Sequence, residues 1–411
     1  MPLVGLLRSL SSKEAIATSF SSLTFGLLSL RYSSPPMYYK PIIRRGAALD
    51  ASLDQFGERR PMKIRAVLLG FVFVAAFCSA FGCGGGGGGQ TGTSRANDTS
   101  ALRQVQSIPM PGVEGRIDHL AVDLQGGRLF VAALGNDTLE VIDLKAGKRA
   151  DEIEGLKEPQ GVVYVPETDK LLVSNGEGGT LDIYDGRSLK LMNKVELGED
   201  PDNVRYDPAS GRAYVGYGTD DSSALGIIDV AKGAKVADIK LSGHPESFQL
   251  EDGGKRIFVN VPTSGHVEVA DREKGAVLET WSVEDAQENF PMALDEADHR
   301  LFIGTRNPAK LLVFDTETGK TVTGLDSSGD ADDIFYDAKT KRIYVSGGEG
   351  AVSIFEQTDP DSYRLAGKVD TAEGARTSLL VAESGTLYVA VPHHGSQQAE
   401  VRTFEIEPET S

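Results

Sequence analysis

The sequence predicts an all-β chain that folds as a seven-bladed β-propeller, closed by pairing of an N-terminal strand with the last blade. The main observation is a short motif of a basic residue, an aliphatic residue, an aromatic or aliphatic residue, and Val or Ile. It recurs seven times, and its third positions are spaced by 42, 42, 44, 44, 42 and 44 residues. The copies begin at Arg128, Lys170, Arg212, Arg256, Arg300, Arg342 and, with Thr in place of a basic residue, Thr386. A period of about 40 residues is typical of propeller blades, and 47 glycines among 411 residues favour the many turns of an all-β fold.

Each repeat carries the signals for four short strands. In five copies an acid lies seven residues before the aromatic position, and a turn such as Asp207-Pro-Ala-Ser-Gly-Arg212 separates the two. The motif itself supplies the second strand, and a third apolar run ends in an acid, as in VIDL at 141–144. After a turn such as Thr318-Gly319-Lys320 comes a fourth strand, for example 194–197. Four strands joined by hairpin turns make one blade, and neighbouring blades bury the faces that a single blade would expose.

The two ends of the repeat region predict how the ring closes. The last repeat supplies only three strands, at Ser378–Val381, Thr386–Val391 and Glu400–Ile406. The missing strand is present at the start of the region, at Leu102–Ile108. Pairing of the two ends would remove two open sheet edges, so we expect residues 101–411 to form one propeller without a second domain.

The charge distribution limits the classes of partner. Residues 1–82 contain 10 basic and 4 acidic residues, whereas the rest contains 32 basic and 56 acidic residues, a formal charge of −24. Such an acidic body argues against nucleic-acid binding, which needs clustered Lys and Arg. The two cysteines, Cys78 and Cys83, both precede the repeats, so the repeats contain no disulfide, cysteine metal site or thiol nucleophile.

The repeats resemble those of the YVTN-type, YncE-like bacterial propellers. The resemblance covers roughly residues 101–407 and is carried by Arg342-Ile-Tyr-Val-Ser and Val313-Phe-Asp-Thr-Glu-Thr-Gly-Lys320 in particular. The Asn of the YVTN pattern is retained only as Asn260. The single Trp281 and the absence of Trp-Asp pairs argue against WD40 repeats. Members of the family are usually exported or surface-associated, and many have no assigned reaction, so the resemblance implies a fold and an exported location.

The segment before the propeller predicts export. In residues 62–83 a basic start is followed by an apolar run, small residues and a cysteine, which is the layout of a secretory signal peptide. Ala80-Phe81-Gly82-Cys83 resembles the lipobox of bacterial lipoproteins, which implies lipidation of Cys83 and tethering to a membrane in the periplasm or at the cell surface. Ordinary cleavage and an uncleaved anchor are the alternatives. Residues 84–100 form a Gly-rich linker, and residues 1–61 are interpreted as a misassigned start, with a transit peptide or cytoplasmic extension as the alternative.

Polar residues are expected to converge at one mouth of the central channel. In a propeller the innermost strand of each blade lines this channel, so the residues that begin these strands meet at one end. Counting twelve and eleven residues back from each aromatic position gives mostly polar side chains. The candidates for a ligand or metal site are Asp118, His119, Asp202, Asn203, Glu246, Asp332, Asp333 and Arg376. A hard cation is one ligand such a set could hold. A water-filled channel in an acidic protein would also collect such residues without any ligand.

The remaining histidines are weaker candidates. His244 lies near Glu246 in the sequence and is the best of them. His393 and His394 are adjacent in a loop, and His266 and His299 are expected at the surface in turns.

Two hypotheses for function follow. The first is an exported, lipid-anchored, monomeric propeller that binds a protein, peptide or envelope component without catalysing a reaction. The second is a propeller enzyme with a divalent cation at the channel mouth, similar to lactone hydrolases of this architecture, or a relative of quinoprotein subunits. No catalytic motif can be matched residue by residue, so the second hypothesis rests on the fold alone.

Overall fold

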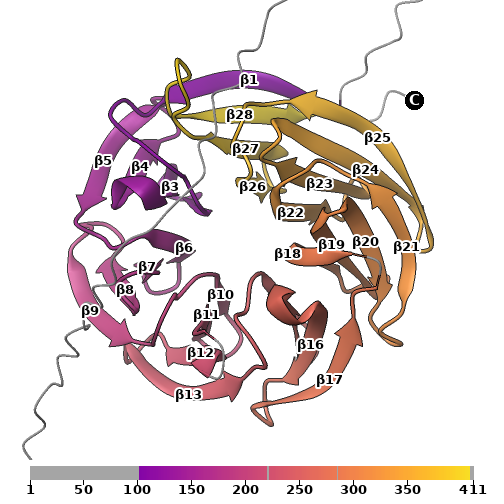
Figure 1. Ribbon diagram of the computed structural model, residues 1–411. Coiled ribbons are helices and arrows are strands. Elements are labelled where there is room, and N and C mark those ends of the chain that lie inside the picture. Colours follow the sequence, from indigo (N-terminus) through magenta and orange to yellow (C-terminus); the bar gives the residue numbers. More distant parts are fainter. Residues whose placement is uncertain (1–100, 220–221, 285, 408–411) are drawn as a thin grey trace, which may run out of the picture. The chain divides into compact units, whose positions relative to one another are not determined.

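The computed structural model describes residues 101–219, 222–284 and 286–407. These residues form seven four-stranded antiparallel sheets arranged as blades around a central axis (Figure 1), which confirms the predicted all-β, seven-bladed propeller. The predicted leader, signal segment, Gly-rich linker and lipidation site at Cys83 lie outside the described residues. Within the described ranges, no helix is both long enough and apolar enough to cross a membrane.

Consecutive strands build the blades, which we number along the chain. Blades 1 and 2 contain β2 (Leu120–Asp123), β3 (Arg128–Ala133), β4 (Thr138–Asp143), β5 (Lys148–Glu154), β6 (Pro159–Val165), β7 (Lys170–Asn175), β8 (Thr180–Asp185) and β9 (Leu191–Glu196). Blades 3 and 4 contain β10 (Val204–Asp207), β11 (Arg212–Tyr217), β12 (Ala224–Asp229), β13 (Ala234–Lys240), β14 (Phe248–Leu250), β15 (Arg256–Val261), β16 (His266–Asp271) and β17 (Ala276–Ser282). Blades 5 and 6 contain β18 (Gln287–Asp295), β19 (Arg300–Asn307), β20 (Ala309–Asp315), β21 (Thr321–Asp326), β22 (Ala331–Asp337), β23 (Arg342–Gly347), β24 (Ala351–Asp359) and β25 (Ser362–Asp370). Blade 7 contains β26 (Ser378–Val381), β27 (Thr386–Val391), β28 (Glu400–Ile406) and β1 (Leu102–Pro109), and two short 3-10 helices, η1 (Leu134–Asn136) and η3 (Pro262–Ser264), lie in loops.

The ring closes as the sequence predicts. Strand β1 pairs antiparallel with β28, with Leu102 opposite Ile406 and Pro109 opposite Glu400. The N-terminal strand therefore completes the last blade from outside, and Figure 1 shows it along the rim beside β28.

The apolar residues pack between blades. In β3, Leu129 and Val131 belong to a cluster shared with blade 7, whereas Phe130 faces the other way and packs with blade 2. Successive side chains of a strand point to opposite faces of the sheet, so the alternating pattern of the motif places apolar groups on both faces. The described residues form seven such clusters, one for each interface between neighbouring blades.

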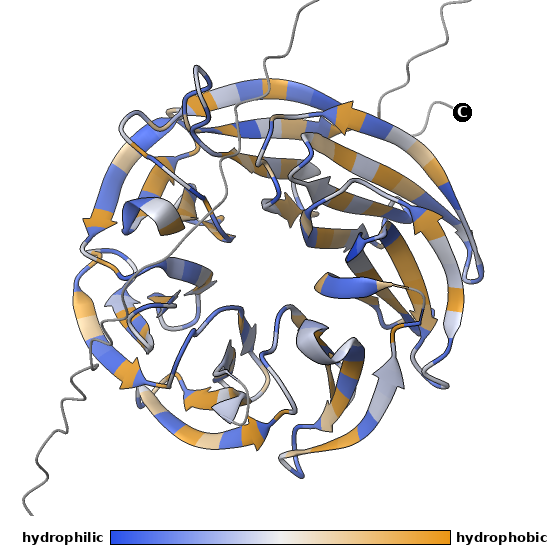
Figure 2. Cartoon of the chain, in the orientation of Figure 1, coloured by the Kyte–Doolittle hydropathy of each residue, from blue (hydrophilic) through white to orange (hydrophobic). Residues whose placement is uncertain are grey.

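The outer strands are the most polar. In β5 only Ile153 is buried, and in β9 only Val195 is buried. Figure 2 shows these rim strands alternating between hydrophilic and hydrophobic residues. The fourth strand predicted at 194–197 is found at Leu191–Glu196, because backbone pairing with β8 extends it to Leu191 although Leu191 and Met192 are exposed.

The basic residue that begins the motif forms hydrogen bonds from one blade to the next. Arg128 Nη1 donates a hydrogen bond of 2.6 Å to the carbonyl of Gly186, the residue directly after the third strand of blade 2. Equivalent bonds run from Lys170 to Val230, Arg256 to Thr316, Arg300 to Pro360 and Arg342 to Glu407, and each acceptor directly follows the third strand of the next blade. In five of the seven copies the basic residue thus bonds to the next blade, which explains why its charge recurs.

The acid seven residues before the aromatic position holds the turn and orients the basic residue. Asp123 Oδ1 accepts a hydrogen bond of 2.8 Å from Gly126 N, and its Oδ2 lies 2.6 Å from Arg128 Nη2. Glu251 and Arg256 form the same pair in blade 4, at 2.6 Å. The fold therefore explains the repeated acid. This acid lies at the far end of the inner strand, away from the residues that begin the strand.

Candidate functional site

The first residues of the inner strands converge, because each blade fixes them in the same way. Asp118 N donates to Ala132 O at 2.7 Å, Asp202 N to Gly216 O at 2.9 Å, and Glu246 N to Asn260 O at 3.0 Å. Each acceptor is the residue at the Asn position of the YVTN pattern, fourteen residues further along. This shared backbone bond is the reason that a fixed count along the sequence finds equivalent positions.

Six of the eight predicted residues interact with one another at this mouth, through ion pairs or through the mutual effects on their pKa values. We call them the mouth cluster: Asp118, His119, Asp202, Glu246, Asp332 and Asp333.

His119 bridges carboxylates from three blades. Its Nδ1 lies 3.4 Å from Asp333 Oδ1, and its Nε2 lies 3.8 Å from both Asp118 Oδ1 and Asp202 Oδ1. Burial lowers the pKa of His119, but Asp333 and Asp118 together outweigh this effect and raise it to about 10. The ring is therefore an imidazolium at neutral pH and acts as a fixed positive charge within the mouth cluster.

Two arginines neutralise one side of the mouth. Arg116 Nη2 lies 3.2 Å from Asp118 Oδ2 and 3.3 Å from Asp332 Oδ2. Arg306 Nη2 donates to Asp332 Oδ1 at 2.7 Å, and its guanidinium stacks over the ring of Phe290 at 3.8 Å. Sequence reasoning missed both arginines, because they belong to no repeated position. The nearness of Arg116 to Asp118 in the sequence was the only available signal.

The other side of the mouth keeps surplus negative charge. Burial and the neighbouring Asp118 raise the pKa of Asp202 to about 6. Burial and Asp202 raise the pKa of Glu246 well above its usual value. Neutralisation of the side formed by Asp202 and Glu246, by a proton or another cation, is therefore favourable. On the side of the two arginines, burial and Asp118 also raise the pKa of Asp332, but Arg306 and Arg116 act against the shift.

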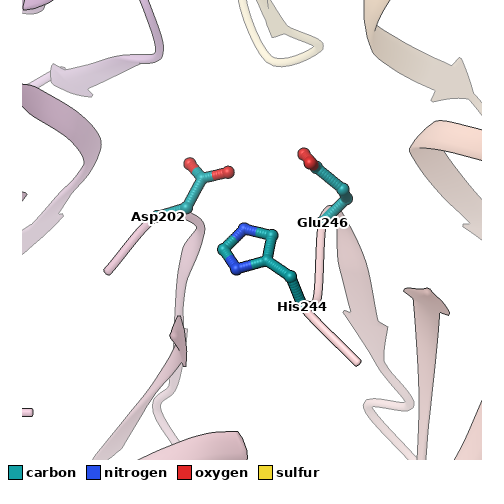
Figure 3. A group of neighbouring side chains, drawn as sticks. All are labelled: Asp202, His244 and Glu246. Atoms are coloured by element: carbon teal, nitrogen blue, oxygen red, sulfur yellow. The ribbon is translucent and has the colours of Figure 1, made fainter. Parts of the chain in front are cut away.

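His244 joins this uncompensated side, as Figure 3 shows. Its ring lies between Asp202 and Glu246, and the three residues offer ligand atoms that all lie within 4.8 Å of one another. Its Nδ1 is 2.7 Å from the carbonyl oxygen of Gly218. His244 thus belongs with the candidate site, although it stands outside the two counted positions.

The other two predicted residues lie beside the cluster. Arg376 Nη2 pairs with Asp330 Oδ2 at 2.7 Å, and Asp330 Oδ1 is also 3.5 Å from Arg306 Nε. Arg376 is therefore linked to the mouth cluster only through Asp330 and Arg306. Asn203 is buried, and its Oδ1 accepts no hydrogen bond from the described residues.

A cavity of about 470 Å³ adjoins the mouth cluster. His119 and Asp333 line it together with apolar side chains of the inner strands, such as Val163, Met292 and Ile334. Polar residues such as Arg205, Gln249 and Ser378 also line it. Because His119 also contacts Asp118 and Asp202, the mouth cluster adjoins a cavity with both polar and apolar walls.

One of the remaining histidines differs from its predicted position. His266 begins β16, and its side chain is only 17% exposed, with Nε2 3.1 Å from Ser242 Oγ and 3.3 Å from Glu268 Oε1. The prediction of a surface position for His266 is therefore wrong. Both partners face the same ring nitrogen, so this group lacks the geometry of a catalytic triad, in which serine and carboxylate occupy opposite nitrogens. His299 is exposed as expected.

Comparison with known proteins supports the fold alone. No family model matches the sequence, and no curated protein matches it. A chain of the hydrazine synthase of Kuenenia stuttgartiensis is similar in structure, with a TM-score of 0.61, 18% identity, and coverage of 68% of this chain and 95% of that one. A chain of a mitotic checkpoint complex is similar with a TM-score of 0.62, 14% identity, and coverage of 81% and 99% respectively. At these identities the likeness establishes the propeller and says nothing of a shared activity.

Proposed function

We propose that the chain is an exported binding module of the cell envelope, and that it holds a ligand supplying positive charge at the channel mouth. The observation that carries the proposal is a pair of buried carboxylate oxygens, Asp118 Oδ1 and Asp202 Oδ1, which accept no hydrogen bond from any described residue. An unsatisfied buried acceptor costs about 1–3 kcal/mol, and more when it is charged. A bound cation would remove this cost. The charge could belong to an organic group of a peptide or envelope component, or to a metal ion.

Export and tethering form part of the same proposal. They are supported by the signal-like segment at 62–83, the lipobox-like sequence before Cys83 and the Gly-rich linker, together with the resemblance of the repeats to YVTN-type propellers. A tether of this kind would leave the channel mouth accessible to components of the envelope.

The proposal is tested with the full chain in mild detergent and excess chelator. Spermidine, lysine ethyl ester and an Arg-rich peptide serve as organic probes, and chelator-free samples receive metal salts. The fluorescence of the single Trp281, which is buried against Phe258 in blade 4, reports thermal unfolding. We expect at least one probe to raise the melting temperature, and the rise to disappear in Asp202→Asn. The exposed Asp326→Asn is the matched control. If no organic or inorganic cation raises the melting temperature, the proposal is wrong.

A metal-dependent hydrolase is the second candidate function. It is favoured by the grouping of Asp202, His244 and Glu246, and by a cavity of about 470 Å³ lined by His119, which contacts Asp202. A metal held there would need an open position for water, which it would activate as a nucleophile. Lactones and simple esters are the substrates to test, with the metal-loaded chain and its Glu246→Gln variant. Turnover that Glu246→Gln abolishes would favour the enzyme, and no turnover with any of these substrates would count against it.

A further inference from the structure

Two adjacent blades each contribute one loop to the uncompensated side of the mouth. Asp202 comes just before β10 in blade 3, and His244 and Glu246 come just before β14 in blade 4. Pro245 separates the last two and packs against the backbone of Gly216, where an added Cβ would lie 3.0 Å from the proline ring. Packing of Pro245 therefore joins the two loops, while a backbone hydrogen bond ties each loop to its own blade, and the three side chains converge from fixed positions (Figure 3).

The hydrogen bond of His244 determines which of its two ring nitrogens can accept a bond on the side of the carboxylates. The carbonyl of Gly218 can only accept, so the 2.7 Å contact requires that Nδ1 carries the hydrogen and donates it. In the neutral ring Nε2 then carries the lone pair. A backbone carbonyl that orients a histidine in this way is a usual outer partner of a metal-binding imidazole. Asp200 Oδ2 lies 3.9 Å from Nε2, too far for a hydrogen bond.

The two carboxylates of the group lack the partners that their neighbours have. Asp118 and Asp332 pair with Arg116, whereas neither Asp202 nor Glu246 forms an ion pair with a Lys or Arg of the described ranges. Asp202 is only 7% exposed, and its buried Oδ1 accepts no hydrogen bond from those residues. The nearest charged group, His119 Nε2, is 3.8 Å from this oxygen, which is too far for a hydrogen bond, so the buried acceptor has room for a further partner.

We propose that Asp202, His244 and Glu246 bind one divalent transition-metal ion between blades 3 and 4. This inference rests on the proposed role of the mouth as a binding site, and it identifies the positive charge as a metal ion held by these three side chains. The outer face of the site is open to the mouth, where Glu246 is partly exposed, so further coordination positions remain for water or for an oxygen atom of a ligand.

The donor set favours a metal such as Zn²⁺ or Mn²⁺ over Ca²⁺ or Mg²⁺. One imidazole nitrogen and two carboxylate oxygens suit Zn²⁺ well, whereas Ca²⁺ and Mg²⁺ prefer oxygen ligands alone. Two ligands of a tetrahedral ion with bonds of about 2.0 Å lie about 3.3 Å apart. The separations here, within 4.8 Å, would close to that value by rotation of side chains.

The test uses the full chain in mild detergent, stripped with chelator and titrated by calorimetry with Zn²⁺, Mn²⁺, Ca²⁺ and Mg²⁺. We expect one equivalent of Zn²⁺ to bind more tightly than Ca²⁺ or Mg²⁺. Loss of an outer partner usually lowers metal affinity about 10- to 100-fold, so His244→Ala and Asp202→Asn should each lower Zn²⁺ affinity by at least that factor. The exposed His299→Ala is the control, with affinity within twofold of the unaltered chain.

A second variant separates ligation from diffuse attraction. Asp332→Asn removes one charge from the same mouth without removing a proposed ligand, so it should weaken Zn²⁺ binding far less than Asp202→Asn. The visible absorption of bound Co²⁺ gives a further readout in the unaltered chain, since nitrogen and oxygen ligands in a tetrahedral field give strong bands.

The outcomes are distinct. Equal losses in Asp332→Asn and Asp202→Asn, or Zn²⁺ binding unchanged in His244→Ala, would overturn the site. Organic cations that stabilise the chain while no metal binds would overturn this inference and leave the proposed function standing. Failure of both kinds of cation would refute both.

Discussion

Replacement of Asp202 by Asn should stabilise the protein at neutral pH. The carboxyl of Asp202 has a pKa of about 6 in the folded chain against an ordinary value of 3.8. The folded state therefore holds this proton more tightly than the unfolded state, and stability falls as pH rises between about 4 and 6. The shift corresponds to about 3 kcal/mol of destabilisation at pH 7. Asn resembles the protonated carboxyl in shape and carries no charge, so Asp202→Asn should recover up to this amount.

The assay is thermal unfolding of the full chain in chelator at pH values from 4 to 8, followed by Trp281 fluorescence. With about 2 °C for each kcal/mol in a domain of this size, we expect a rise in melting temperature of about 6 °C at pH 7 and none at pH 4. The gain is an upper limit, because His119 loses one of its carboxylate partners. The reasoning is refuted if Asp202→Asn lowers the melting temperature at pH 7, or if the difference between variant and unaltered chain does not depend on pH.

Three further outcomes follow from the same structure. The pKa of His119 is raised to about 10, so its contribution to stability is present below about pH 6.5 and is lost as pH rises to 10. His119→Gln should have a lower melting temperature than the unaltered chain at pH 7, and its melting temperature should not decline between pH 7 and 10. A decline equal to that of the unaltered chain would contradict this. Arg256→Met should cost about 2–3 kcal/mol, because a mostly buried carboxylate and a carbonyl of the next blade lose their partner. Arg187→Ala, which removes an exposed arginine whose carboxylate partner is also exposed, should cost less than about 1 kcal/mol in the same urea titration. Cys83→Ser should release the exported chain from the membrane fraction on cell fractionation while Cys78→Ser leaves it bound, and equal behaviour of the two variants would count against lipidation at Cys83.

The architecture could be predicted because the blades repeat the same pattern of apolar packing. The aliphatic and aromatic positions of the motif feed the clusters on both sides of a blade, as Leu129 and Phe130 do, so the period of the apolar pattern is the period of the fold. The closing strand could be predicted because the last repeat lacks one. The role of the repeated basic residue could not, since the carbonyl that Arg128 reaches belongs to Gly186, and only the packing of blades brings the two together.

The site could be predicted only as far as the repeat extends. Asp118, Asp202 and Glu246 each form an equivalent backbone hydrogen bond, and each therefore lies at the same number of residues before the motif. The two arginines that neutralise Asp118 and Asp332 have no common offset from the motif, since Arg116 precedes β2 and Arg306 lies on β19. Arg306 contacts Asp332 from the preceding blade, and counting residues along the sequence cannot predict such a contact.

The same limit explains the two histidines. His119 and His244 both lie at the mouth, but three surrounding carboxylates raise the pKa of the first, whereas the second is oriented by the carbonyl of Gly218, which contacts its Nδ1. Their roles differ through contacts between blades, and residue type alone gives no indication of this.

If the channel mouth is completed by a cation beside Asp202, anomalous diffraction at the zinc absorption edge should locate it in crystals of the chain soaked in Zn²⁺. We expect one strong peak in contact with Asp202, His244 and Glu246. A mouth without a peak, or a peak held by Asp118 and Asp332 on the side that Arg116 already neutralises, would contradict this expectation.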